Sequence, residues 1–126
     1  MELTRVLLYS HEHFILKKIS LWEKTMYGLI GKMITVEGQR DELVSILLQG
    51  MQDMPGCQSY IVAHDPSDPD AVWVTEVWQD QASHQASLTL PSVQAAIARG
   101  RPMIAGFGER YETIPVGGIG LKIPLE

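Results

Sequence analysis

CQSYIVAHDPSDPDAVWVTEVWQ, residues 57–79, contains two strand patterns joined by one turn. Residues 57–64 and 71–79 are rich in β-branched and aromatic side chains, which alternate between two faces. The intervening DPSDPD, residues 65–70, favours a turn, because proline cannot donate to a ladder and aspartate bonds its own backbone. The stretch therefore predicts two consecutive strands of an antiparallel sheet. In the second of them Glu76 and Trp78 share a face.

Upstream of this stretch the sequence predicts one strand and one helix. YGLIGKMITV, residues 27–36, is rich in β-formers, and both of its faces are apolar. From Gln39 to Met54 the apolar residues recur at helical spacing, and Pro55-Gly56 ends the helix. A strand with two apolar faces needs a cover on each, and the helices supply one.

Downstream, Asp80 is a suitable N-cap for a short helix to about Leu88. Pro91 is well placed to open a second helix through Arg99, which Gly100 closes. We expect a loop over 101–107 and a last strand over 109–116, followed by an apolar, glycine-rich tail. The order of elements is then β-α-β-β-α-β.

This order predicts an α+β, ferredoxin-like split βαβ domain over residues 26–126, with a four-stranded antiparallel sheet and helices on one face. The other sheet face would be a large apolar patch in water, and pairing with a second copy is its simplest cover. We therefore expect a homodimer, with the tail contributing to the interface.

Residues 1–25 are surplus to this plan. We interpret them as an N-terminal extension upstream of a natural start at Met26, since Trp22-Glu23-Lys24 requires a purine-rich codon run at ribosome-binding distance. The alternative is an ordered arm or an added strand.

Composition excludes several classes of protein. The net charge is −5, and residues 26–126 alone carry −6, so a nucleic-acid partner is not expected. No apolar run approaches the ~20 residues of a membrane span, and no signal peptide is recognisable, so we expect a cytoplasmic protein. The single cysteine, Cys57, excludes an internal disulfide and a cysteine-rich metal site.

Residues 54–97, MPGCQSYIVAHDPSDPDAVWVTEVWQDQASHQASLTLPSVQAAI, resemble the antibiotic biosynthesis monooxygenase family of the dimeric α/β-barrel superfamily. The resemblance rests on Pro55-Gly56, the Asp-Pro turn, the run from Glu76 to Asp80, and His84 six residues after Trp78. It implies an oxygenase that uses no metal or organic cofactor and oxidises a quinol, a polyphenol or a related aromatic with O₂.

The resemblance also implies roles for individual residues. The position of Trp78 lines the family's cavity, that of His84 holds histidine in many quinol-type relatives, and a pocket arginine falls near Arg99. An asparagine of some anthrone oxidisers is Val74 here, which argues against an anthrone substrate. The haem-ligand histidine of haem-degrading relatives would fall near Ile97, so haem is not expected.

Chemistry supports His84 as the catalytic base, because a histidine pKa suits proton removal from a phenol at cellular pH. Trp78, Tyr60 and Met33 could form a polarisable wall for a flat ring, and Arg99 could stabilise the phenolate. Each has a plainer interpretation: a solvated histidine, core packing, or a cation at a helix C-terminus. For Glu76, a structural ion pair or hydrogen bond is the expectation.

The sequence thus predicts a cofactor-independent monooxygenase whose partners are a small aromatic substrate, O₂ and a second copy of the chain. The alternative is a non-oxygenase protein that uses the same cavity for binding or for isomerase-like proton transfer. A third interpretation is a structural dimer with a vestigial pocket. No metal site or glycine-rich phosphate loop is expected.

Overall fold

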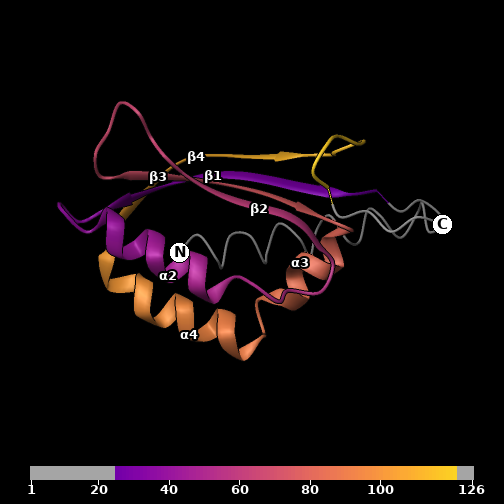
Figure 1. Ribbon diagram of the computed structural model, residues 1–126, viewed down its shortest axis with the longest axis horizontal. Helices are drawn as coiled ribbons and strands as arrows, with labels where there is room; N and C mark the ends of the chain where they lie inside the picture. The colour runs from indigo at the N-terminus through magenta and orange to yellow at the C-terminus, as the bar shows by residue number, and fades with distance from the viewer. Residues whose placement is uncertain (1–24, 122–126) are drawn as a thin grey trace.

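The computed structural model describes residues 25–121 and has the expected α+β architecture, in which one antiparallel sheet is covered on one face by helices (Figure 1). The sheet has four strands in the order β2-β3-β1-β4. Along the chain the elements are β1 (Tyr27–Thr35), α2 (Arg40–Gly50), β2 (Cys57–His64), β3 (Ala71–Trp78), α3 (Gln81–Ser87), α4 (Pro91–Gly100), the 3₁₀ turn η2 (Arg101–Met103) and β4 (Ile104–Thr113). The ferredoxin-like fold is confirmed. The interpretation of residues 1–25 falls almost entirely outside the described range.

The turn between β2 and β3 forms as the sequence predicts. Asp65 accepts a hydrogen bond from the Ser67 backbone at 2.7 Å, and Asp68 accepts one from the Asp70 backbone at 2.9 Å. Both are local aspartate turns, which reverse the chain without a ladder partner. They bring β2 and β3 into register, with Tyr60 opposite Glu76.

The helices pack on the sheet through two clusters of buried side chains. On α2, Leu43, Ile46 and Leu47 recur at three and four residues, face the sheet and are buried. Together with the buried β3 residue Val72, each such side chain contributes roughly 1.5–3 kcal/mol through its removal from water. This packing fixes the distance between the helices and the sheet, and the cavity described below lies in the space between them.

Two element boundaries differ from the prediction. The helix expected over 39–54 ends at Gly50, where α2 passes so close to α4 that an added Cβ would lie 2.6 Å from Ala96 Cβ. The last strand, expected over 109–116, begins at Ile104 and includes much of the predicted loop. The register of β1 with β4 shifts between Gly31 and Met33, so β4 contains a bulge that its glycines accommodate.

The other face of the sheet carries no helix in the described part of the chain (Figure 1). Across it Ile61, Thr75, Ile30 and Tyr111 pair in one row through all four strands. Ile61 is 56% exposed and Tyr111 is 53% exposed. No helix among the described residues is long and apolar enough to cross a membrane.

Candidate active site

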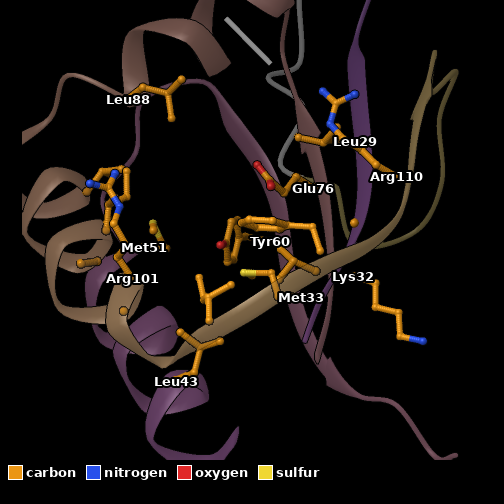
Figure 2. Close-up of a pocket in the computed structure, with 18 of the residues that line it drawn as sticks. Leu29, Lys32, Met33, Leu43, Met51, Tyr60, Glu76, Leu88, Arg101 and Arg110 are labelled. Atoms are coloured by element: carbon orange, nitrogen blue, oxygen red, sulfur yellow. The ribbon is translucent and has the colours of Figure 1, made fainter. Parts of the chain in front are cut away.

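A cavity of about 540 Å³ lies between the sheet and the helices, within the roughly 300–1,000 Å³ typical of small-molecule sites. All four strands contribute to its lining, together with α2, α3, α4 and η2. Most of the lining is apolar, and the polar groups come from a few side chains. Figure 2 shows Tyr60 and Met33 at the sheet side and Met51 and Arg101 at the helix side. The space suits a flat, mostly apolar molecule.

The structure brings four of the five predicted site residues to this cavity: Met33, Tyr60, Trp78 and His84. Arg99 is exposed on α4 and does not line it, so its position gives no support to the predicted contact with a phenolate. The arginines that do line the cavity are Arg101 and Arg110, at opposite ends (Figure 2). Helical spacing alone could not distinguish Arg99 from Arg101, because η2 redirects the chain after Gly100.

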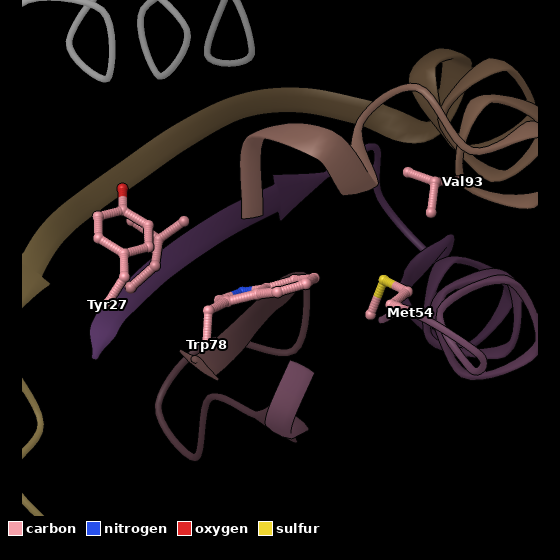
Figure 3. Close-up of a cluster of buried hydrophobic side chains, with 5 residues drawn as sticks. Tyr27, Met54, Trp78 and Val93 are labelled. Atoms are coloured by element: carbon pink, nitrogen blue, oxygen red, sulfur yellow. The ribbon is translucent and has the colours of Figure 1, made fainter. Parts of the chain in front are cut away.

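Trp78 belongs both to the core and to the cavity wall. Its ring is almost fully buried in a cluster with Tyr27, Met54 and Val93 (Figure 3). The indole Nε1 donates a hydrogen bond to Glu76 Oε1 at 2.9 Å. A tryptophan fixed in this way is a rigid wall rather than an adaptable contact.

His84 is held by α3 in a buried position. Asp80 caps this helix by accepting a hydrogen bond from the Ser83 backbone at 2.8 Å, as the sequence predicts. The imidazole lies between two rings, with centroid distances of 5.2 Å to Tyr27 and 5.4 Å to Trp78. His84 is 5% exposed, so the plainer interpretation of a solvated histidine on a short helix is excluded.

The two nitrogens of His84 have different surroundings. Nε2 lies 4.0 Å from Glu76 Oε1, which is too long for a hydrogen bond. Nδ1 is buried and lacks a hydrogen-bond partner within the described part of the chain. Burial, and to a smaller extent the charge of Arg110, lower the pKa of His84 to about 4. His84 is therefore neutral at cellular pH.

Glu76 is the polar residue whose importance the sequence understates. Its side chain is 15% exposed and lines the cavity. Burial raises the pKa of Glu76 to about 7, although the hydrogen bond from Trp78 and the charge of Arg110 act in the opposite direction. The alternation along β3 already placed Glu76 on the Trp78 face, but it could not show that this face borders a cavity.

A second polar group lies where β4 borders the cavity. The Arg110 guanidinium lies 3.6 Å from the Glu112 carboxylate, which also accepts a hydrogen bond from the Tyr27 hydroxyl. Burial and this bond raise the pKa of Tyr27 far above its ordinary value, so Tyr27 stays a neutral donor. Arg110 thus places a fixed positive charge beside the Glu76–His84 pair.

Gly31 lines the cavity and leaves space beside the backbone of β1. It pairs with Val74 and Arg110, and an added Cβ would meet nothing within 4 Å. Glycine inside a strand is unfavourable and often marks a place where a ligand approaches the backbone.

We expect Gly31→Val to fold normally, because valine favours strands, and to weaken binding of 1,4-naphthoquinone about tenfold or more by filling the cavity. Titration calorimetry measures this, and Gly31→Ala should show an intermediate loss. Unchanged affinity in Gly31→Val would place the ligand elsewhere.

Within residues 25–121, no three His, Cys, Asp or Glu side chains are grouped closely enough to hold a metal ion.

Comparisons with known proteins agree with this fold. Residues 26–99 match the family described as antibiotic biosynthesis monooxygenase. A Chloroflexus aurantiacus crystal structure, provisionally named as an antibiotic biosynthesis monooxygenase, is 63% identical, with a TM-score of 0.75, and the match covers 77% of this chain and 99% of that one.

A Caulobacter crescentus structure with a similar provisional name is 18% identical, with a TM-score of 0.68, and the match covers 78% of this chain and 96% of that one. A Shewanella oneidensis protein is also 18% identical, with a TM-score of 0.64, over 75% and 96% of the two chains. At this identity the two show the fold alone. No protein of curated function matches the sequence significantly.

Proposed function

The chain belongs to the antibiotic biosynthesis monooxygenase family, and on this premise we propose that it is a cofactor-independent monooxygenase that oxidises a quinol, a polyphenol or a related electron-rich aromatic with O₂. The observation that carries the proposal is the cavity: an apolar space of about 540 Å³ whose polar groups include a buried carboxylate and a buried imidazole 4.0 Å apart. Such a site can hold a flat ring, exclude water and remove a proton.

The reaction needs little from the protein beyond these groups. A quinol loses a hydroxyl proton to the Glu76–His84 pair, and the resulting anion gives one electron to O₂. The two radicals combine into a carbon-bound peroxide, whose O–O bond then breaks. One oxygen atom stays on the ring and the other leaves as water, so that quinol and O₂ give a hydroxyquinone and H₂O. The sequence assigns the proton to His84, and a well-placed base typically contributes ~10²–10⁴-fold.

Oxygen uptake with a panel of hydroquinones tests this function. We expect the protein to consume one O₂ per hydroquinone after treatment with a chelator, and to transfer one atom of ¹⁸O₂ to the product. Gly31→Val is the control, because it fills the cavity without changing a titratable group. Equal uptake in this variant would indicate oxidation outside the cavity. Binding of the panel without uptake would favour the alternative, a non-oxygenase binding or proton-transfer protein.

We further propose that the protein acts as a homodimer. The support is the apolar row across the uncovered sheet face, which includes Ile61 and Tyr111, both more than half exposed. Apolar patches of this kind mark interaction surfaces in soluble proteins.

A further inference from the structure

We propose that Glu76 is the catalytic residue that accepts the proton of the substrate hydroxyl, and that His84 is a neutral positioning residue beside it. The proposal deepens the monooxygenase function proposed above and rests on it. It reverses the roles that the sequence suggests, in which Glu76 is structural and His84 is the base.

The first argument is the place of Glu76 in the sheet. In β3 it pairs with Leu29 of β1 and Tyr60 of β2, and all three side chains face the helices. Figure 2 shows the carboxylate next to Tyr60, directed into the space across which Leu88 lies. A ring lying over the sheet would meet this carboxylate at its edge, where a hydroxyl group is.

The second argument is that Glu76 lacks the contacts of a structural ion pair. Its hydrogen bond comes from the neutral Trp78 indole, at 2.9 Å. Within residues 25–121 its one ion-pair contact is the His84 imidazole, at 4.0 Å, which is longer than a hydrogen bond. The charge of Arg110 offsets only part of the cost of burying this carboxylate, so Glu76 gains from taking up a proton.

The third argument compares the charges before and after proton transfer. When Glu76 takes the proton, one negative charge moves from the carboxylate to the phenol oxygen, and the number of charged groups in the cavity is unchanged. When His84 takes it, a new imidazolium and a new phenolate must both form in a medium of low dielectric constant. Arg110, whose charge helps to lower the pKa of His84, disfavours the imidazolium further. The transfer to Glu76 therefore has the lower cost.

The groups around Glu76 are consistent with this role. Burial brings its pKa to about 7, near the pH at which a general base works best. The titratable and charged groups that act on it come from every neighbouring element: Tyr27 of β1, Tyr60 of β2, His84 of α3 and Arg110 of β4. Glu112 of β4 lies against Arg110 and Tyr27. The two tyrosines have raised pKa values and stay neutral, so neither competes with Glu76 as a base.

His84 then acts through its position. Its ring packs against Tyr27 and against Trp78, whose indole donates to Glu76, so His84 supports the position of that donor. Its loss should disturb substrate binding more than proton transfer.

The test uses the full chain and the hydroquinone that gives the fastest O₂ uptake. We expect Glu76→Gln to lower kcat/KM by about 10²-fold or more and to abolish the rise of activity with pH near pH 7. His84→Gln should keep that rise and change KM more than kcat. Glu42→Gln, an exposed carboxylate on α2, should behave as the wild type. If Glu76→Gln folds poorly by circular dichroism, Glu76→Asp should retain the pH-dependent rise at a lower rate.

The opposite result overturns the proposal: activity in Glu76→Gln that still rises near pH 7, with the rise lost in His84→Gln. A wild type without O₂ uptake on any hydroquinone would refute the monooxygenase function separately. In that case infrared difference spectra with 4-nitrophenol still test the proton transfer. A carboxylic-acid band that appears on binding and is absent in Glu76→Gln supports it, and the same spectra in both proteins contradict it.

Discussion

Relative to the wild type, the free energy of unfolding of Glu76→Gln is expected to rise by about 3 kcal/mol as the pH increases from 4.5 to 7. The folded state raises the pKa of Glu76 from 4.5 to about 7, so it binds a proton that the unfolded chain has released. Glu76 therefore does not lower the free energy of unfolding below pH 4.5, and it lowers it by the full amount above pH 7. Removing the carboxylate removes that effect.

His84→Gln is expected to show the opposite dependence, with a fall of about 3 kcal/mol relative to the wild type between pH 4 and pH 6.5. The folded state lowers the pKa of His84 from 6.5 to about 4, so the unfolded chain binds the extra proton. The neutral imidazole thus contributes stability above pH 6.5, which is lost as the pH falls towards 4. The two effects largely cancel in the wild type between pH 4.5 and 6.5, where both groups are uncharged.

Urea denaturation at a fixed protein concentration, repeated across this pH range, measures both differences. Glu42→Gln is the matched control, because its carboxylate is exposed on α2 and its difference from the wild type should stay flat. If the free energy of unfolding of both cavity variants, relative to the wild type, did not change with pH, neither group would be held in the uncharged form. This measurement requires no substrate, so it tests the electrostatics of the site independently of its chemistry.

Much of the fold was predictable because the local signals agree with one another. The alternation in β3, the aspartate turn and the capping residue Asp80 each specify one conformation, and the structure confirms all three. The start of β4 was not predictable in this way. Gly106 and Gly108 have low β-propensity, and this part of the strand depends on pairing with β1.

Several residues of the candidate site were predictable from the sequence, but their burial and electrostatic surroundings were not. Trp78, Tyr60 and Met33 were proposed as a wall for a flat ring, and all three line the cavity. The burial of His84 was missed, because its neighbours Ser83 and Gln85 are polar and the residues that cover it come from β1 and β3. Electrostatic effects of this kind depend on tertiary contacts, which no local pattern contains.

A charge on the uncovered sheet face should weaken the proposed dimer strongly. We expect Ile61→Asp to raise the dissociation constant of the proposed dimer at least about a hundredfold, by sedimentation velocity over a concentration series. Ile61 is 56% exposed and begins the row that continues through Thr75 and Ile30 to Tyr111. A two-fold symmetric interface contains every residue twice, so one substitution buries two unpaired carboxylates.

Leu48→Asp is the control that distinguishes this effect from a general change in charge or stability. Leu48 is 53% exposed, nearly the same as Ile61, but it lies on α2, on the helical side of the molecule (Figure 1). It should therefore leave the dimer intact, while a monomeric Ile61→Asp should retain its secondary structure. Stable dimers commonly bury upwards of ~1,200 Å² in total, more than the edge of one strand provides. A dimer that tolerates Ile61→Asp but dissociates with Leu48→Asp would place the interface on the helices. A wild type that is monomeric at micromolar concentration would show that the apolar row stays in water.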